Sequence, residues 1–199
     1  MTDISATWQR IETWLSHNAP QVTPGLAPGA TDAQIAATER TLGVILPEEV
    51  RAFYRIHDGQ RTDRSLGGVV GGVFAPGGDF LSLARIVDEW TVWKDLLDSG
   101  AFDGIWSDPQ PGIKPDWWNP RWIPITYDGS GNHFCLDLDP APGGTAGQII
   151  TMWHDGGERE VMAASFIDWL TQLADEYERG EWVYSEDDGG VVRLEDVSE

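Results

Sequence analysis

The sequence is poor in cysteine and in basic residues. Its single cysteine, Cys135, excludes a disulfide within the chain and, with it, a disulfide-stapled fold. Thirteen Lys and Arg residues stand against 33 Asp and Glu, which gives a formal net charge of −20 at pH 7. A surface of this charge repels phosphate backbones, so we expect no nucleic-acid partner. It attracts a basic protein and speeds the encounter with it.

Long apolar runs are also lacking. No stretch reaches the roughly 18 apolar residues that a membrane helix needs. The first residues show no charged region followed by an apolar one, which a secretory signal would have. We therefore expect a protein that works in the cytoplasm without a membrane partner. At 199 residues, the chain is long enough to bury a sizeable core as one domain with extensions.

Apolar spacing predicts helices on both sides of a central β region. Apolar residues recur at three- and four-residue steps in several segments, as on one face of a helix. Thr31 and Gln34 match a capping box at the start of the second segment. Residues 20–30 are rich in proline and glycine and predict a linker loop. The predicted helices cover residues 4–15, 31–41, 47–56, 83–97 and 166–179.

The stretch 122–140 predicts a hairpin at the centre of the fold. Ile123 and Ile125 mark a first strand, and the Asp, Gly, Ser and Asn residues of 128–132 favour a tight turn. Apolar and polar residues then alternate along 133–139, the period of a strand with two unlike faces. We therefore expect one apolar face and one polar, acidic face, with 148–153 as the next strand. After the turn, the apolar set is Phe134, Leu136 and Leu138, and the polar set is His133, Cys135, Asp137 and Asp139.

The polar set suggests several chemistries, but none has the required spacing. The two histidines and nearby carboxylates at 133, 137, 139, 154 and 155 could gather if the strands pair, yet they match no metal-ligand motif. Residues 128–139 resemble a calcium loop only in part, since His133 stands where glycine is needed. No phosphate-binding glycine motif is present. We therefore assign no catalytic residue, no metal ligand and no cofactor.

Residues 98–121 predict a long irregular segment, and such segments are often functional. Its tryptophans have two interpretations: they cover the open end of the core, or they form an aromatic platform for a protein or a sugar ring. Nearby aspartates would give such a platform an acidic rim. The candidate partner-binding residues are Trp117, Trp118, Trp122, Asp103, Asp108, Asp116, Asp128, Asn132, His154 and Asp155.

Four blocks in order, residues 35–59, 122–140, 147–155 and 164–170, resemble the Smi/Knr-like family of the SUKH superfamily. The resemblance covers roughly residues 28 to 172. It implies an α+β fold with a mostly antiparallel central sheet and helices packed on it. We accordingly expect an N-terminal helix and linker over 1–27, a SUKH-like domain over 28–180 and an acidic C-terminal extension over 181–199.

The resemblance also implies a protein-binding module without enzymatic activity or cofactor. Bacterial members of this family are commonly immunity proteins that neutralise a toxin domain, often a nuclease, and fungal members regulate glucan synthesis and wall signalling. Our first expectation is an immunity protein that occludes a basic toxin domain. One alternative is an intracellular regulator or scaffold of cell-wall assembly or signalling. Another is a hydrolase or glycan-binding protein that uses the Trp-rich loop and the acidic hairpin face.

Overall fold

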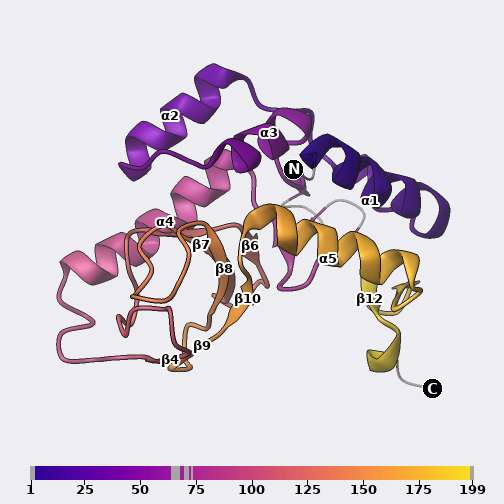
Figure 1. The fold of residues 1–199 in the computed structure, drawn as a ribbon. Coiled ribbons are helices and arrows are strands. Elements are labelled where there is room, and N and C mark those ends of the chain that lie inside the picture. The colour runs from indigo at the N-terminus through magenta and orange to yellow at the C-terminus, as the bar shows by residue number, and fades with distance from the viewer. Residues whose placement is uncertain (1–2, 64–67, 70–71, 73, 198–199) are drawn as a thin grey trace.

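A four-stranded antiparallel sheet lies at the centre of an α+β fold (Figure 1). The computed structural model describes residues 3–63, 68–69, 72 and 74–197. Within these ranges the helices are α1 (Ile4–Asn18), α2 (Asp32–Leu42), α3 (Glu48–Ile56), α4 (Leu83–Asp98) and α5 (Phe166–Glu178), with 3-10 turns η1 (Thr23–Gly25) and η2 (Leu194–Asp196). The strands are β1 (Thr62–Asp63), β2 (Gly68–Val69), β3 (Asp79–Phe80), β4 (Asp108–Pro109), β5 (Trp122–Pro124), β6 (Thr126–Tyr127), β7 (His133–Asp137), β8 (Gln148–Met152), β9 (Glu158–Arg159), β10 (Val161–Ala163), β11 (Trp182–Ser185) and β12 (Gly190–Arg193).

The predicted helices are confirmed as α1 to α5, and the first ends at Asn18 rather than at residue 15. Local chemistry explains where they begin. Thr31 and Gln34 form the predicted capping box, in which each side chain bonds the backbone of the other residue. Ser82 and Ser165 cap α4 and α5 with a single bond each, which the serine side chain accepts from a backbone N–H three residues ahead. None of the helices in the described ranges is long and apolar enough to cross a membrane.

The central sheet has the strand order β10-β8-β7-β5, and all its pairs are antiparallel. In its middle, His133 pairs with Met152 and Asp137 with Gln148, so β7 and β8 run side by side over their full length. The mostly antiparallel sheet expected from the sequence is therefore confirmed. Smaller two-stranded pairs surround it: β1 with β2, β3 with β6, β11 with β12, and the parallel pair of β4 and β9.

The first face of the sheet carries Ile123, Phe134, Leu136 and Ile149, which belong to the main hydrophobic core. Because side chains alternate along a strand, these residues point to one side, as the sequence predicts. The helices α1, α3 and α5 supply the opposite wall of this core (Figure 1). The Phe134 ring lies 5.9 Å from that of Trp169 on α5, in an edge-to-face arrangement.

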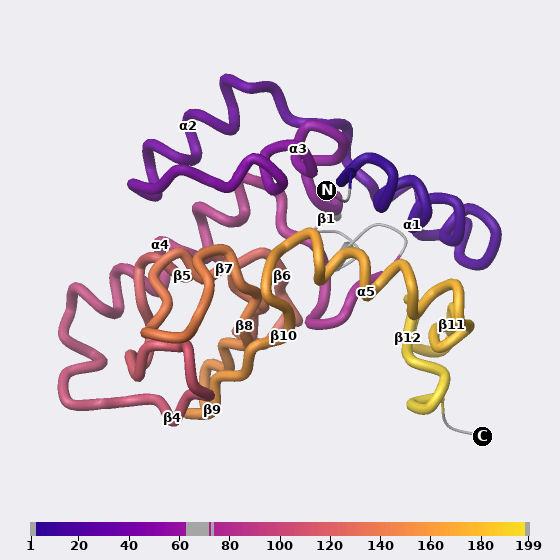
Figure 2. Tube along the Cα trace, viewed as in Figure 1, coloured from indigo at the N-terminus to yellow at the C-terminus, as the bar shows by residue number. Residues whose placement is uncertain are grey.

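The second face of the sheet is also buried, which corrects the expected exposed, acidic face of the hairpin. His133, Cys135 and Asp137 are all 0 % exposed. Helix α4 and residues 99–121 cover them, at the end of the molecule away from the β11–β12 hairpin (Figure 2). The sequence predicts an irregular segment at 98–121. Its apolar residues follow no helix or strand period, so the sequence does not show that they pack on the sheet. The second core consists of Trp93, Ile113, Trp118, Trp122, Cys135, Ile150 and Met152.

Two polar side chains of the second face, His133 and Asp137, are bonded inside the protein. His133 Nδ1 lies 2.8 Å from the Thr126 carbonyl oxygen, and Trp93 Nε1 donates to His133 Nε2 at 3.3 Å. These two partners specify a neutral imidazole with its proton on Nδ1, and burial lowers the pKa of His133 to about 4. Asp137 accepts bonds from the Asp139 N–H and the Gln148 side chain, both at 2.9 Å. Burial raises the pKa of Asp137.

Both terminal segments pack into the same main core. Trp8 and Leu15 of α1 are 1 % and 0 % exposed, and Trp182 and Val191 of the β11–β12 hairpin are also buried there. The described parts of the predicted N-terminal segment (residues 3–27) and of the predicted C-terminal extension (residues 181–197) therefore contribute side chains to the same core as the SUKH-like domain predicted for 28–180. Burial of such apolar side chains is the largest favourable contribution to folding.

Candidate functional site

A surface groove of about 550 Å³ lies between α4 and the two turns that follow β6 and β8. It brings together parts of the chain that are far apart in sequence: the outer side of α4, the segment after it, and residues 129–131 and 154. Three of the predicted partner-binding features meet here, namely Trp117, the turn at 128–132 and His154. The lining residues are Glu89, Val92, Trp93, Leu96, Phe102, Trp117, Tyr127, Gly129, Ser130, Gly131 and His154.

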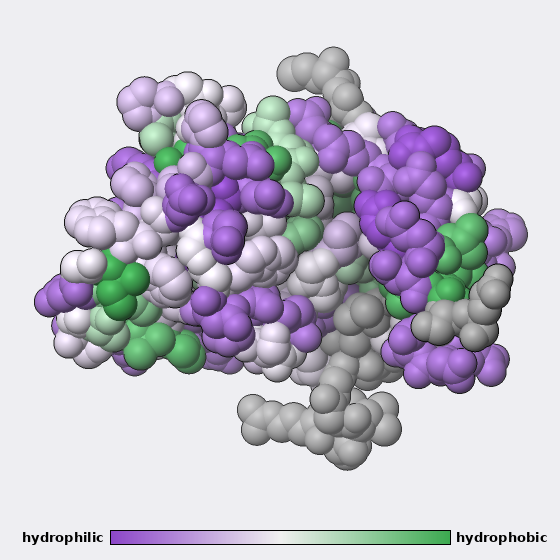
Figure 3. Space-filling view, turned by 90° about the horizontal axis from the view of Figure 1, so that it is seen from below, coloured by the Kyte–Doolittle hydropathy of each residue, from purple (hydrophilic) through white to green (hydrophobic). Residues whose placement is uncertain are grey.

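One wall of the groove is apolar and open to solvent. Val92 and Leu96 are 57 % and 40 % exposed, and they lie one helical turn apart on α4. Trp93 forms the floor, and its ring stacks on that of Phe102 with 5.8 Å between the centroids. In Figure 3, green apolar side chains gather at the left end of the view, the end of the molecule that holds α4 and the segment after it. Contiguous apolar surface beside a hollow is typical of an interaction site.

A hydrogen-bonded turn forms the opposite wall. The Asp128 carboxylate accepts four bonds: from the Ser130 N–H and hydroxyl, both at 2.7 Å, and from the Asn132 N–H and side-chain amide, at 3.0 and 2.7 Å. Burial raises the pKa of Asp128, but these bonds outweigh it and hold the pKa below its usual value. Gly131 has a φ of +107°, and a Cβ there would come within 3.3 Å of His154.

Asn132 connects this turn to the next one. Its side-chain oxygen accepts a bond from the His154 N–H at 2.9 Å, while its amide group donates to Asp128. Asp128 and Asn132, both predicted to bind a partner, therefore use their polar groups largely within the protein. Their role in the structure is to shape the rim of the groove. Asp128 remains exposed, so its charge still faces solvent.

A buried arginine, which the sequence analysis missed, braces Trp117. Arg159 is 0 % exposed, and it donates to the carbonyl oxygens of Gly156 at 2.7 Å, Glu158 at 2.8 Å and Trp117 at 2.9 Å. Its guanidinium carbon also lies 5.4 Å from the centre of the Trp117 ring. Burial lowers the pKa of Arg159. Arg159 stands between two glutamates in the sequence, a setting that predicts an exposed side chain. No signal in the sequence therefore indicates that it is buried and bound to Trp117.

The other two tryptophans of the predicted platform are inaccessible. Trp118 and Trp122 are 2 % and 0 % exposed and belong to the second core. A partner cannot reach their side chains without unfolding this end of the molecule, so the expectation that they bind it is corrected. Of the predicted aromatic platform, only Trp117 is half-buried and lines the groove.

The predicted acidic rim of Asp103, Asp108 and Asp116 is only partly assembled. Asp103 is exposed and follows the groove residue Phe102 in the chain, and Asp155, a candidate predicted apart from the rim, is exposed and follows His154. The other two lie apart from the lining. Asp108 is on β4, which pairs with β9, and Asp116 accepts a bond from Asn119 at 2.7 Å and pairs with Trp106. Glu89, which the sequence analysis did not select, lines the groove instead.

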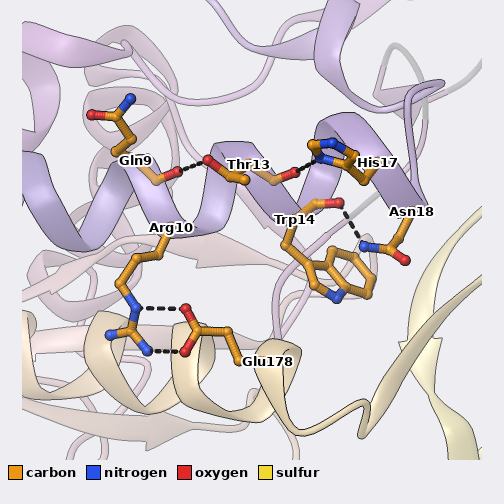
Figure 4. A pocket seen from close by; sticks show the side chains of 7 residues that line it. All are labelled: Gln9, Arg10, Thr13, Trp14, His17, Asn18 and Glu178. Atoms are coloured by element: carbon orange, nitrogen blue, oxygen red, sulfur yellow. Dashed lines mark hydrogen bonds and ion pairs between the residues drawn. The ribbon is translucent and has the colours of Figure 1, made fainter.

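A second hollow, between α1 and α5, has the properties of a helix-helix seam (Figure 4). Arg10 is bound to Glu178 through two bonds, at 2.7 and 2.6 Å, and Trp14 stacks on Tyr177 with 4.1 Å between ring centroids. His17 and Asn18 bond carbonyl oxygens of their own helix. Most of the polar side chains that line this hollow are thus bonded within the protein. Across the described part of the chain, no three His, Cys, Asp or Glu side chains are grouped to hold a metal ion.

Comparisons with known proteins agree with the resemblance seen in the sequence. A model of the SMI1 / KNR4 family (SUKH-1) matches residues 29–172. The chain is 31 % identical, over 94 % of its length, to the cell wall biosynthesis/cell cycle regulator smi1 of Schizosaccharomyces pombe and covers 39 % of it. It is 27 % identical, over 92 % of its length, to the glucan synthesis regulatory protein of Neurospora crassa and covers 40 % of it.

A third relative has a similar name and a similar coverage. The chain is 27 % identical, over 90 % of its length, to the cell wall assembly regulator SMI1 of Saccharomyces cerevisiae and covers 41 % of it. The chain therefore spans about two fifths of the length of these curated relatives. Each alignment reaches beyond 29–172, since it covers at least 90 % of this chain.

Proposed function

Because the chain belongs to the SMI1 / KNR4 family (SUKH-1), we propose that it is a non-catalytic, protein-binding regulator of cell-wall assembly. The names of its relatives support this role, since they describe regulators of the cell wall or of glucan synthesis. None of these three names refers to toxin immunity or to hydrolysis. The regulator, an alternative in the sequence analysis, is therefore preferred to the immunity protein and to the hydrolase or glycan-binding protein.

The observation that carries the proposal is the position of the groove within the shared region. Its lining residues lie between Glu89 and His154, and the family model matches residues 29–172. The groove is thus part of the domain that this chain has in common with the fungal regulators. Because the chain covers only two fifths of these relatives, we propose for it the binding role of this domain.

The charge of the chain supports a basic partner. A net charge of −20 draws a positively charged protein to the surface and makes the association depend on salt. We place this encounter in the cytoplasm. In this role the protein recruits or holds other proteins and does no chemistry itself.

A domain exchange in yeast tests the proposal. The region of the S. cerevisiae regulator SMI1 that aligns with this chain is replaced by residues 1–199, and the chimera is expressed in a strain that lacks the native gene. We expect restored growth in the presence of a dye that stresses the cell wall. The matched control carries Leu136→Asp, which places a charge in the main core and abolishes folding. A chimera that accumulates to the native level but leaves the cells sensitive would contradict the proposal.

A further inference from the structure

We propose that the groove beside α4 docks a short basic segment of a partner protein, in which one bulky apolar side chain is flanked by Lys or Arg. The inference rests on the proposed protein-binding function and names the chemistry of its partner. Two independent features of the groove carry it: an apolar wall that packs against neither core, and carboxylates that form no ion pair with a Lys or Arg of the described part of the chain.

The apolar wall formed by Val92 and Leu96 takes no part in the packing of α4 against the two cores. The inward stripe of this helix contains Ile86 and Trp93, which are buried, and Trp90 and Leu97, which pack partly against the cores. Val92 and Leu96 lie off this stripe and remain exposed. Aliphatic side chains at i and i+4 present one continuous strip along a helix. Together with Phe102 and Trp117, which also line the groove, this strip makes a hollow that fits an apolar side chain.

The carboxylates around the groove form no ion pair with a Lys or Arg among the residues that the structure describes. Glu89 lines the groove, and among the residues that the structure describes no cation lies within ion-pair distance of it. The two cations of α4 are engaged elsewhere, Arg85 with Asp79 and Lys94 with Asp98. Asp103, Asp128 and Asp155 border the groove and are exposed. A partner that brings its own cations therefore gains ion pairs and relieves repulsion among these carboxylates.

The groove is preorganised, because internal hydrogen bonds hold both of its sides in place. Arg159 holds Trp117 through a bond to its carbonyl oxygen and a guanidinium over its ring, and is itself held by the carbonyl oxygens of Gly156 and Glu158. The bonds that join Asp128, Asn132 and His154 hold the opposite wall. A preformed site loses little conformational entropy on binding. A sugar is a poorer fit, because stacking needs an open aromatic face and the floor residue Trp93 is only 7 % exposed.

Selection from a display library of random 12-residue peptides tests the inference without a known partner. The library is selected on the whole 199-residue chain, and recovered peptides are measured by fluorescence anisotropy. We expect them to share one or two aliphatic or aromatic residues flanked by Lys or Arg. Replacing either the apolar or the basic residues of a recovered peptide with Ser should weaken binding at least tenfold.

Matched variants of the protein locate the binding. The Val92→Ser/Leu96→Ser variant should weaken binding at least tenfold, and Glu89→Gln should weaken it about threefold. Ile45→Ser changes an exposed apolar residue that does not line the groove, and Glu186→Gln changes an exposed acid of the β11–β12 turn. Both variants should bind like the wild type. Circular dichroism confirms that every variant is folded. Recovered peptides that are acidic or uncharged, or that bind the double variant as tightly as the wild type, would overturn the inference.

The yeast chimera separates this inference from the proposed function. If the chimera with Val92→Ser/Leu96→Ser restores growth as well as the wild-type chimera, the regulatory role stands and the groove is not its docking site. If neither chimera restores growth although peptides bind in the groove, the result supports the docking site and contradicts the regulatory role. Restoration by the wild-type chimera alone supports both.

Discussion

The two faces of the central sheet are buried by different means. On the first face, Phe134, Leu136 and Ile149 pack against the apolar sides of regular helices. On the second, His133 and Asp137 are bonded internally beneath Trp93, Trp118 and the other side chains of the second core. The first face is stabilised by the burial of apolar surface, and the second also depends on the internal hydrogen bonds of His133 and Asp137.

This difference predicts where pH acts on the fold. Among the core residues of the sheet, those on the first face have no titratable side chain, whereas His133, Cys135 and Asp137 all face the second core. Burial shifts the pKa of each of them toward its neutral form. The second face is thus sensitive to protonation, and the first to loss of volume. The following experiments test this contrast.

The largest effect is expected on the first face. Leu136→Ala removes a side chain that is 0 % exposed and leaves a cavity between β7 and α5. The free energy of unfolding should fall by about 2–5 kcal/mol, the usual range for such a change. Urea denaturation measures it, with Ile45→Ala at a site that is 78 % exposed as the control. Equal, small losses for both variants would show that the first face is not packed as described.

The second face should lose stability in acid through His133. Its pKa is about 4 in the folded protein and about 6.5 when unfolded, so the unfolded chain takes up the proton first. This contribution is fully present above pH 6.5 and is lost as the pH falls through 6.5 toward 4. The total loss is about 3 kcal/mol, from roughly 2.5 pKa units at 1.36 kcal/mol each.

Comparison with a variant isolates this effect from other titrations. His133→Gln should show a flatter dependence of unfolding free energy on pH between 6.5 and 4, measured by urea denaturation at each pH. The pKa can also be followed directly in the folded wild type by NMR of the imidazole. An imidazole of His133 that titrates near 6.5 in the native protein would contradict the burial of this face.

A smaller loss is expected from removing the other polar residue of this face. Asp137→Ala takes the acceptor from the Asp139 N–H and removes one of two acceptors of the Gln148 side-chain amide. The cost should be about 1–3 kcal/mol, as for a buried donor left without a partner. Urea denaturation at pH 7 measures it. No change in stability would mean that water reaches these groups, so that the face is open.

The smallest effect is expected beside the second face, on the wall of the groove. Val92→Ser replaces a side chain that is 57 % exposed and contributes nothing to either core. The unfolding free energy should change by about 0.5 kcal/mol or less. Thermal unfolding followed by circular dichroism checks this. A drop as large as that of Asp137→Ala would assign Val92 to the fold and remove it from the docking surface.

The elements of the first face could be predicted because each has a local signal. Helix α2 begins where Thr31 and Gln34 form a capping box, and Phe134 and Leu136 alternate with polar neighbours. Alternation shows that the two sides of a strand differ, but it does not show that the polar side is exposed. Burial of His133 and Asp137 depends on partners such as Trp93 and Gln148, which the chain brings from a distance.

The candidate site was predicted only in part for the same reason. Trp117 and His154 could be selected by residue type, and they do line the groove. Trp118 has the same local signal as Trp117, yet it is buried because the segment folds back onto the sheet. Val92 and Arg159 have no distinguishing signal at all, since their roles follow from a surplus apolar position and from three carbonyl groups that meet only in the fold.

The single cysteine provides the most direct test of the central claim, that the polar face of the hairpin is a second core. Cys135 is 0 % exposed on this face, and burial raises the pKa of its thiol, so it should be unreactive while the protein is folded. An aromatic disulfide reagent that releases a coloured thiolate on exchange measures the reactivity of thiols at pH 8. Because Cys135 is the single cysteine, the signal comes from this thiol alone. We predict no labelling in buffer on the timescale of minutes and complete labelling in concentrated urea. Labelling in buffer as fast as in urea would contradict the claim.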